Sequence, residues 1–430
     1  MTETVSPAQH VSGAISVPGD KSISHRFAML TSIAEGESHI LNYSTGADCQ
    51  STLCCMSRLG IRHEFGERDG RKELIVHGRG TQGLTPASEP LDAGNSGSTI
   101  RMLSGILAAQ PFTTTIFGDE SLSRRPMRRI MAPLGEMGAE IEAANGQFPP
   151  LTIHGRRLRA IEYQPPVASA QVKSCVLLAG LYAEGETVVT EPIRTRDHTE
   201  IALRELGADI KVEHRRISVR GGASLIAKNL VVPGDISSAA FFLVAAMIVK
   251  DADLVIAHVG LNPTRTSLLD FLNSIGASIE SLQVESVNGE LIGNLRVKNS
   301  RARGGEISGE LSAALIDEIP VLSILGALSE NGLVVKDAAE LRVKETDRIS
   351  TVAENLGRMG AKVETRPDGL AIPGKQKLHA AALDSFGDHR IAMAFAVAAL
   401  AADGACEIRN AEAASVSYPE FYETLRDIAC

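Results

Sequence analysis

The sequence predicts an α/β protein of two similar domains, each made of three repeated units around buried helices. The first observation behind this prediction is the tetrapeptide Val-Pro-Gly-Asp, which begins at Val17 and again at Val232, half the length of the 430-residue chain later. The second is a pair of sequence patterns that recur about every 70 residues. A Pro-Gly pair marks a turn, so the tetrapeptide indicates where each of two equivalent halves begins.

One recurring sequence pattern consists of an apolar helix end, a glycine and a stretch in which apolar and polar residues alternate. A glycine just past a helix supplies the left-handed closing residue that a Cβ disfavours, and strict alternation is typical of a half-buried strand. Each unit is therefore predicted to contain an amphipathic helix that turns tightly into a strand. The glycines are Gly60, Gly138, Gly207, Gly276 and Gly360.

The other sequence pattern is a polar cluster followed by a helix whose faces are nearly all apolar, as expected of a buried helix. Asp, Asn and Ser are preferred where the first amides of a helix need an acceptor. Together the two sequence patterns predict six units, three before the second Val-Pro-Gly-Asp and three that begin at or after it. The runs open at Asp20, Asn95, Ser169, Asp235, Asp317 and Asp388.

The sixth unit reaches the last residues of the sequence before another glycine and strand occur. We therefore expect the strand at residues 14–17, "AISV", to complete it. This places the N-terminal segment in the second domain, and the predicted domains are 20–233 and 1–19 plus 234–430.

The amino-acid composition limits the classes of molecule that the protein is expected to bind. The formal charge is −9 and Trp is absent, which disfavours nucleic-acid binding. The six Cys show no paired spacing typical of zinc sites or a disulfide framework. The N-terminus lacks the pattern of a signal peptide, and the longest apolar runs are shorter than the ~20 residues of a membrane span. These features predict a cytoplasmic protein without nucleic-acid, membrane or metal partners.

Charged residues stand at the openings of the predicted buried helices. Duplication for stability alone, as in solenoids, is the alternative reading, but it gives no reason for charges at these places. Helix N-termini attract anions, so six of them facing a common cleft predict a phosphorylated or carboxylated substrate. The charged residues are Lys21, Arg26, Arg101, Lys173, Asp317, Glu318, His389 and Arg390.

Two further clusters combine cations with a helix start. In "ELRVKETDRI", Lys344 and Arg348 precede an apolar helical stripe, where positive charge opposes the helix dipole unless an anion compensates it. A solvated charged loop is the other interpretation. In "SLSRRPMRRI", each Arg is equally consistent with gripping an anion and with solvation.

Nine ordered motifs resemble the 5-enolpyruvylshikimate-3-phosphate synthase family over essentially the whole chain, in the subgroup usually called class II. The resemblance implies two domains of three βαβαββ units each, an inverse α/β barrel with the substrate cleft between the domains. It also implies a monomer without a cofactor and a target of the herbicide glyphosate. The motifs are "PGDKSISHR", "GNSGSTIR", "RRPM", "SAQVK", "RDHTE", "NPTR", "IDE", "RVKETDR" and "DHRIAMA".

The reaction that the resemblance implies belongs to aromatic amino acid biosynthesis. It joins the 5-hydroxyl of shikimate 3-phosphate to C2 of phosphoenolpyruvate through a tetrahedral intermediate and then expels phosphate. A group must take the hydroxyl proton, and a group must protonate the methylene carbon and later remove that proton. Cations must hold two phosphates and two carboxylates.

The resemblance assigns residues to both substrates and to the chemistry. Asp317 and Glu345 are implied as the acid–base pair, with Lys21 and Lys344 assisting, and which carboxylate performs which step stays open. Phosphoenolpyruvate is implied to contact Lys21, Asn95, Gly97, Arg125, Gln171, Arg348 and Arg390. Shikimate 3-phosphate is implied to contact Ser22, Arg26, Ser169, the backbone of Ala170, Gln171, Arg196, Asp317 and Lys344.

One position departs from the better-known class I pattern, because Val416 stands where that pattern has Lys.

Two alternative functions remain. The sister family transfers enolpyruvyl to UDP-N-acetylglucosamine, but it has a Cys in the loop matching "DESLSRRP", where this sequence has none. The other alternative is a non-catalytic phosphate-binding module.

Overall fold

The structure, a computed structural model, describes residues 1–68 and 71–430 and divides into two compact units. Unit 1 consists of Met1–Pro18, Pro233–Glu285 and Leu291–Cys430, and unit 2 consists of Gly19–Val232 and Ser286–Glu290. The sequence-based domains differ from these units by one residue at each crossing. They also placed 286–290 in the second domain, whereas the structure assigns this turn to unit 2.

The turn 286–290 belongs to unit 2 because its side chains bond there. Asn288 Oδ1 accepts a hydrogen bond from the Val231 amide at 3.0 Å. Oε1 of Glu290 lies 2.7 Å from Nδ1 of His198, and both side chains are nearly fully buried.

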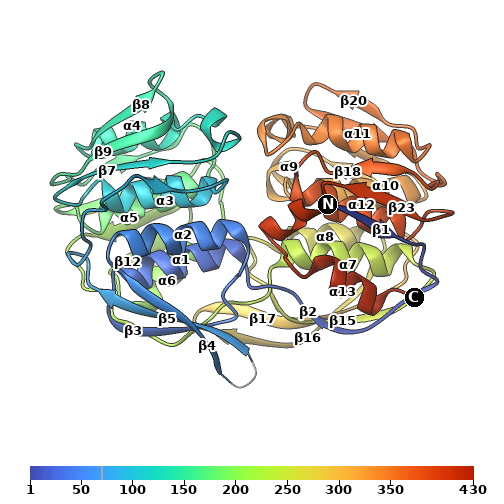
Figure 1. Ribbon diagram of the computed structural model, residues 1–430, viewed down its shortest axis with the longest axis horizontal. Helices are drawn as coiled ribbons and strands as arrows, with labels where there is room; N and C mark the ends of the chain where they lie inside the picture. The colour runs from blue at the N-terminus through green and yellow to red at the C-terminus, as the bar shows by residue number, and fades with distance from the viewer. Residues whose placement is uncertain (69–70) are drawn as a thin grey trace. The chain divides into compact units, whose positions relative to one another are not determined.

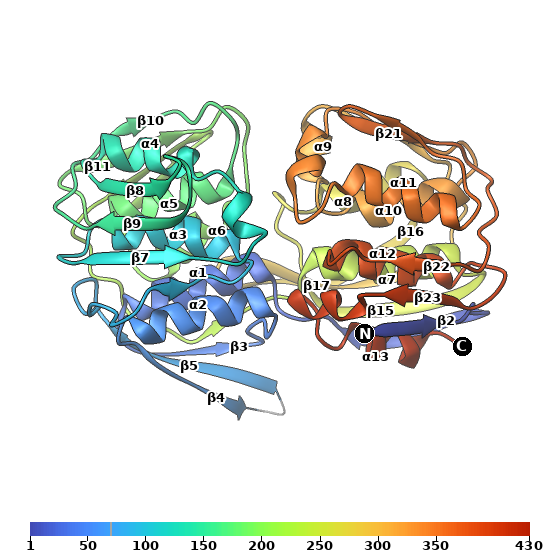
Figure 2. The same ribbon diagram turned by 45° about the horizontal axis from the view of Figure 1, so that its top comes forward.

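The described residues of unit 2 form three four-stranded sheets, one for each predicted repeat. In each sheet the first pair of strands is parallel and the other pairs are antiparallel. Figure 2 shows β7, β9 and β8 of the second sheet side by side. In spatial order the sheets are β14 (Leu230–Val231), β3 (Glu35–Leu41), β5 (Arg71–Arg79) and β4 (Arg62–Arg68); β6 (Leu91–Asp92), β7 (Thr113–Phe117), β9 (Phe148–His154) and β8 (Glu140–Ala144); and β10 (Glu162–Tyr163), β11 (Glu186–Thr190), β13 (Arg216–Arg220) and β12 (Ile210–Glu213).

Three buried helices occupy the interior of unit 2, and three helices with a more exposed face alternate with them along the chain (Figure 1). The buried helices are α1 (Lys21–Ser32), α3 (Gly97–Leu107) and α5 (Ala170–Gly180). The others are α2 (Ala47–Arg58), α4 (Arg128–Glu136) and α6 (His198–Glu205), with the short 3-10 turn η1 (Leu122–Arg124) before α4.

Unit 1 repeats this plan, with two four-stranded sheets and a three-stranded one. The sheets, in spatial order, are β16 (Ser278–Val287), β17 (Glu290–Lys298), β15 (Asp251–Gly260) and β2 (His10–Ser16); β18 (Gly305–Ile307), β19 (Leu333–Val335), β21 (Gly369–Ile372) and β20 (Glu364–Arg366); and β1 (Thr2–Val5), β23 (Cys406–Arg409) and β22 (Ala382–Asp384). The buried helices are α7 (Ile236–Ile248), α10 (Ile319–Leu328) and α12 (His389–Ala399). The remaining helices are α8 (Ser267–Ser274), α9 (Glu310–Ala314), α11 (Arg348–Arg358) and α13 (Phe421–Ile428), with the 3-10 turns η2 (Ala339–Val343) and η3 (Ala411–Val416).

The N-terminal segment completes two sheets of unit 1, and the prediction for residues 14–17 is wrong. Strand β2 pairs in parallel with β15 in the fourth unit, including residues 14–16, and only its start meets the sixth unit, where Val11 bridges Ala429. The sixth sheet is completed by β1, whose residues pair antiparallel with β23 (Figure 1). The alternation of "AISV" predicted a strand correctly, but it carries no information about the strand's partner.

The strands before the two Val-Pro-Gly-Asp turns are exchanged between the halves. Strand β2 precedes α1 of unit 2 but pairs with β15 of unit 1, while β14 precedes α7 of unit 1 but pairs with β3 of unit 2. The turn glycines leave no room for a side chain. A Cβ on Gly19 would collide with the Asn42 carbonyl oxygen, and one on Gly234 would lie 2.8 Å from Cγ2 of Val17.

Helix ends follow the sequence pattern at most positions. All five glycines after the amphipathic helices have positive φ, between 82° and 102°. Asp20, Ser169, Asp235 and Asp388 cap the buried helices that they open. The other two openings differ from expectation: Ser96 caps α3 in place of Asn95, and α10 begins after Glu318 without a side-chain cap. Pro320 in the first turn of α10 has no amide to satisfy, which reduces the need for a cap.

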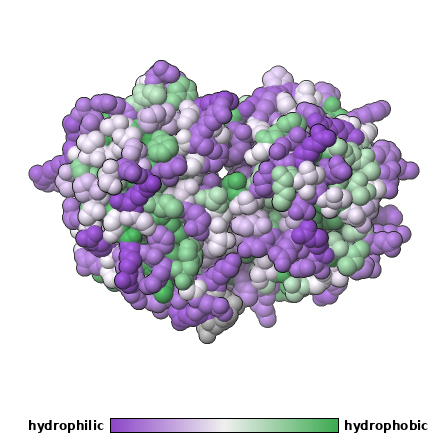
Figure 3. Space-filling model, in the orientation of Figure 1, coloured by the Kyte–Doolittle hydropathy of each residue, from purple (hydrophilic) through white to green (hydrophobic). Residues whose placement is uncertain are grey.

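Hydrophilic residues dominate the face in Figure 3, and hydrophobic side chains gather there only in small groups. In the described part of the chain, no helix combines the length and apolar character that a membrane crossing requires. Each unit has one hydrophobic core formed largely by its buried helices.

Candidate active site

The starts of α1, α3 and α5 carry most of the site residues that the sequence predicted in unit 2. These helix starts are polar because the first amides of a helix lack intrahelical partners. Asp20 Oδ1 accepts from the Ile23 amide at 2.9 Å. Ser169 caps α5, so the amide of Ala170 is among the unpaired first amides of this helix.

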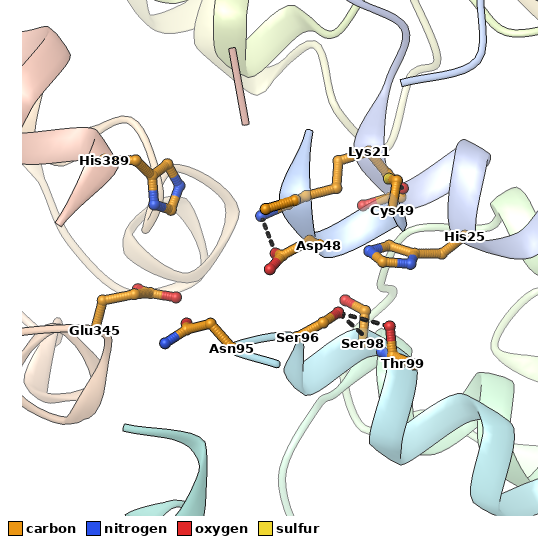
Figure 4. Close-up of polar contacts among 12 residues, drawn as sticks. Lys21, His25, Asp48, Cys49, Asn95, Ser96, Ser98, Thr99, Glu345 and His389 are labelled. Atoms are coloured by element: carbon orange, nitrogen blue, oxygen red, sulfur yellow. Dashed lines mark hydrogen bonds and ion pairs between the residues drawn. The ribbon is translucent and has the colours of Figure 1, made fainter. Parts of the chain in front are cut away.

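Lys21, the first residue of α1, is held by an acidic residue that the sequence analysis did not single out. Its Nζ lies 2.9 Å from Oδ2 of Asp48, and the two side chains are 23% and 11% exposed. Figure 4 shows them pointing toward one another. Asp48 therefore orients an ammonium group that is still accessible to a ligand.

Arg26 and Arg196 converge on Ser22. Arg196 donates to the Ser22 hydroxyl at 3.1 Å, and Arg26 donates to the Ser22 carbonyl oxygen at 2.7 Å. Arg26 also bonds Thr199 and Ser174, at 2.6 and 2.8 Å. Burial lowers the pKa of Arg26 to about 10, so the group remains a cation at neutral pH and fixes the shape of this corner.

The predicted residues of the second helix start form another linked group. Arg125 donates to Oδ1 of Asn95 at 2.9 Å, and Asn95 donates to Asp119 at 2.7 Å. Gln171 on α5 accepts from Arg101 at 2.7 Å. The Arg of "SLSRRPMRRI" that reaches this group is thus Arg125.

Gly97 lies beside two of these arginines. A Cβ there would stand 2.8 Å from Nη1 of Arg101 and 3.7 Å from Nη1 of Arg125. Any side chain at this position must displace the end of Arg101.

Two buried networks behind these helix starts were not predicted. Lys173 lies 3.1 Å from Glu191 and 2.6 Å from Glu200, and all three side chains are at most 3% exposed. The motifs "SAQVK" and "RDHTE" contain Lys173 and Glu200, but no local spacing indicates that the two motifs meet.

The second network joins α1, α2 and α3. His25 Nδ1 lies 2.7 Å from the Thr52 hydroxyl, which lies 2.7 Å from the Thr99 hydroxyl. Thr99 in turn donates to Ser96 through both its amide and its hydroxyl (Figure 4). Burial lowers the pKa of His25 to about 3, so this imidazole is neutral at physiological pH.

We expect His25 to make the protein acid-sensitive. Its folded pKa lies below the ordinary 6.5 of the unfolded chain, so the unfolded state takes up a proton that the folded state refuses. Stability is therefore complete above pH 6.5 and falls as the pH decreases toward 3. Between pH 7 and pH 5 this group alone should remove about 2 kcal/mol.

Urea unfolding of the wild type and of His25→Gln at both pH values measures this loss. The variant cannot titrate, so its loss of stability on acidification should be smaller by about 2 kcal/mol. His10→Gln, at an exposed position, serves as the control and should keep the wild-type slope. Identical slopes for His25→Gln and wild type would contradict the prediction.

In unit 1 the predicted residues gather around Arg348, the first residue of α11. Its guanidinium lies 2.8 Å from Asp388, 2.7 Å from Glu345 and 3.4 Å from Asp317. The Arg348 side chain is 2% exposed. Burial alone would lower the pKa of Arg348, but the charges of Asp388, Glu345 and Asp317 raise it above its ordinary value.

This arrangement changes the interpretation of "ELRVKETDRI". The positive charge at the start of α11 is compensated by carboxylates of the protein itself, including the capping residue Asp347. Lys344 lies 3.5 Å from Asp317 and 3.6 Å from Glu340, and its side chain is 21% exposed. Lys344 is thus the more accessible of the two predicted cations.

The start of α12 adds three consecutive charged or titratable residues. Asp388 is fully buried, and His389 and Arg390 are 3% and 7% exposed. The sequence pattern places His389 at a helix opening but indicates no role for it. Val416, where the class I pattern has Lys, lies in η3 and lines a shallow depression with Phe386 and Gly387, just before α12.

The predicted site residues are thus divided between the two units. Across residues 1–68 and 71–430, no cluster of three or more His, Cys, Asp or Glu side chains is arranged to hold a metal ion. Unit 2 carries Lys21, Ser22, Arg26, Asn95, Gly97, Arg125, Ser169, Ala170, Gln171 and Arg196. Unit 1 carries Asp317, Lys344, Glu345, Arg348 and Arg390.

Comparison with known proteins identifies the family. The sequence model of the family described as EPSP synthase (3-phosphoshikimate 1-carboxyvinyltransferase) matches residues 5–425. A protein of Solibacter usitatus named 3-phosphoshikimate 1-carboxyvinyltransferase is 64% identical over 429 residues, covering 100% of both chains. One of the same name from Koribacter versatilis is 53% identical, covering 99% of this chain and 98% of the relative.

Solved structures agree with the fold. EPSP synthase from Acinetobacter baumannii has a TM-score of 0.89 and 42% identity, covering 100% of this chain and 98% of that one. The enolpyruvyl transferase NikO from Streptomyces tendae has a TM-score of 0.81 over 99% of this chain and 96% of its own, at 18% identity, and so bears on the fold alone. The resemblance and the fold class predicted from the sequence are confirmed.

Proposed function

Because the chain belongs to the EPSP synthase (3-phosphoshikimate 1-carboxyvinyltransferase) family, we propose that it transfers the enolpyruvyl group of phosphoenolpyruvate to the 5-hydroxyl of shikimate 3-phosphate and releases phosphate. The structural observation that supports this most is the pair Asp317 and Glu345, which share the guanidinium of Arg348 at 3.4 and 2.7 Å. Two carboxylates fixed by one buried cation suit a reaction that moves a proton off oxygen and another onto carbon.

Binding is proposed to rest on the cations and first amides of the helix starts. In unit 2, Ser22, Arg26 and Arg196 form a donor-rich corner suited to the phosphate of shikimate 3-phosphate. Lys21, held by Asp48, and Arg125, which lies beside Gly97, supply charge for phosphoenolpyruvate. Helix N-termini add partial positive charge without a counterion.

The chemical step is proposed to use Asp317 and Glu345 in unit 1. One carboxylate accepts the proton of the 5-hydroxyl as the hydroxyl oxygen bonds to C2 of phosphoenolpyruvate, while the other, in its protonated form, gives its proton to the methylene carbon C3, which becomes a methyl group. Removal of a proton from this methyl group then expels phosphate from C2 and restores the double bond. Lys21 and Lys344 assist by stabilising negative charge on oxygen.

A phosphate-release assay tests this proposal against its alternatives. Shikimate 3-phosphate and phosphoenolpyruvate together should give phosphate, whereas UDP-N-acetylglucosamine and phosphoenolpyruvate should not. Release with the nucleotide sugar instead would identify the sister activity. Binding of both anions without release would identify a non-catalytic module.

Gly97 is expected to control access of glyphosate, which we propose competes with phosphoenolpyruvate here. The Cβ of Gly97→Ala would displace Arg101, which bonds Gln171, and would narrow the space beside Arg125. The longer inhibitor should suffer more than the substrate, because exclusion depends on shape. The native protein should be inhibited, and the variant should raise the inhibition constant about tenfold more than the KM for phosphoenolpyruvate.

Inhibition curves at matched phosphoenolpyruvate saturation measure this difference. Gly135→Ala is the matched control, because among the described residues the Cβ added there meets no heavy atom within 4 Å apart from its own helix backbone and chain neighbours, and its curve should follow the wild type. If the Gly97→Ala curve also follows the wild type, Gly97 does not control access. The position of Val416 is then the next one to vary.

We also propose that the protein works in the cytoplasm as a monomer and without a cofactor. The cytoplasmic location is predicted from the composition and the N-terminal sequence, whereas the monomeric state and the absence of a cofactor are implied by the motif resemblance. Sedimentation with and without both substrates tests the monomeric state.

A further inference from the structure

Buried charges at three helix starts of unit 1 form a chain of contacts that the proposed roles do not explain. The four residues are Asp235 before α7, Arg265 of "NPTR", Glu318 before α10 and Arg390 of α12. Their exposed fractions do not exceed 8%. Their charges alternate in sign along the chain of contacts, so the buried group is formally neutral, which limits the cost of burying it.

The links between Asp235, Arg265 and Glu318 pass through one hydroxyl. Nη2 of Arg265 lies 3.5 Å from Oδ1 of Asp235 and donates to the Ser237 hydroxyl at 2.6 Å. Ser237 in turn donates to Oε1 of Glu318. The Glu318 carboxylate is thereby held by the buried Ser237 hydroxyl, which itself accepts a hydrogen bond from the Arg265 guanidinium.

The last contact in the chain, from Glu318 to Arg390, is different in kind. Nη1 of Arg390 lies 3.6 Å from Oε1 of Glu318, which is an ion-pair distance but too long for a hydrogen bond. Within the described residues, this buried nitrogen has no hydrogen-bond acceptor. A buried donor without an acceptor is unusual in a folded protein, and a guanidinium suits carboxylate and phosphate groups.

We propose that Glu318 is a positioning residue for Arg390, and that Ser237 and Arg265 keep Glu318 in place. The charge of Glu318 holds the Arg390 guanidinium at a distance that leaves Nη1 free to bond an anionic group of phosphoenolpyruvate. This inference rests on the proposed function, since it takes Arg390 as a ligand of that substrate. A purely structural ion pair is the competing explanation.

Glu318→Gln tests the charge of this carboxylate at nearly unchanged side-chain volume. The amide oxygen can still accept from Ser237, but the guanidinium of Arg390 loses its partner charge. We expect the KM for phosphoenolpyruvate to rise roughly tenfold, with the KM for shikimate 3-phosphate within about twofold and kcat within about threefold of wild type. A purely structural pair would lower stability and leave the ratio of the two KM values unchanged.

Ser237→Ala tests the link without removing a charge, and so gives an answer even if Glu318→Gln folds poorly. It should raise the KM for phosphoenolpyruvate about threefold, and its effect should be largely absent when added to Glu318→Gln, because both act through one carboxylate. Ser323→Ala is the matched control, since the hydroxyl of this buried α10 serine donates to the Ile319 carbonyl oxygen of its own helix. It should leave both KM values unchanged.

Wild-type phosphate release, measured first, separates the two proposals. If the wild type is active and Glu318→Gln keeps or lowers the KM for phosphoenolpyruvate, or if the effects of the two variants multiply, the positioning role is wrong and the proposed function stands. If the wild type releases no phosphate, both proposals fail.

Discussion

Asp317→Asn and Glu345→Gln should each lower kcat by about a thousandfold or more while leaving the fold intact. Both amides are close in shape to the carboxylates but cannot exchange a proton. The fold should persist because Arg348 keeps the fully buried carboxylate of Asp388 at 2.8 Å in either variant. Shikimate 3-phosphate should still bind within about tenfold of wild type.

Steady-state kinetics of phosphate release, together with titration of shikimate 3-phosphate, measures both quantities. Glu340→Gln is the matched control: Glu340 also lies near Lys344, at 3.6 Å, but its side chain is 58% exposed. It should turn over at close to the wild-type rate. Near-native kcat in either test variant removes that residue from the acid–base chemistry.

Lys173→Met should lower the free energy of unfolding at pH 7 by about 3–5 kcal/mol. Removal of the ammonium leaves Glu191 and Glu200 buried together, each at most 3% exposed. Burial already raises the pKa of Glu200, and loss of Lys173 should raise it further. A raised folded pKa means that stability falls as pH increases, so the loss should be smaller at pH 5 than at pH 7.

Urea unfolding at the two pH values gives the comparison. Lys228→Met removes an exposed ion pair in the same unit, where Nζ lies 3.2 Å from Glu205, and should cost at most about 1 kcal/mol. Adding Glu191→Gln and Glu200→Gln to Lys173→Met should recover much of the stability. Equal losses for Lys173→Met and Lys228→Met would show that burial of the triad does not matter.

The sequence allowed the repeats, the buried helices and the family to be predicted because each depends on local pattern. Gly60 and its four equivalents follow amphipathic stripes, and "RVKETDR" lies on consecutive residues. Pairings between distant segments could not be read in this way. Nothing local indicates that β1 joins β23 while β2 joins β15.

The same limit applies to the site. The place of Arg348 at a helix start predicts a neighbouring anion but does not identify it, and in the structure Asp317, Glu345 and Asp388 are that anion. Lys173 and Glu200 stand in two different motifs, and their meeting depends on how α5 packs near α6. The sequence therefore identified residue types at the site more readily than their partners.

The exchange of β2 and β14 between the halves sets an order of events during synthesis on the ribosome. Strand β2 (His10–Ser16) leaves the ribosome long before its partner β15, which begins only at Asp251. At about 5–20 residues per second, translation leaves the N-terminal segment without its partner for roughly 10–50 s. The first sheet of unit 2 is also incomplete until Leu230–Val231 appear. A nascent chain of this protein therefore carries β2 as an unpaired strand until β15 has been made, a stage at which a chaperone would have a strand to bind.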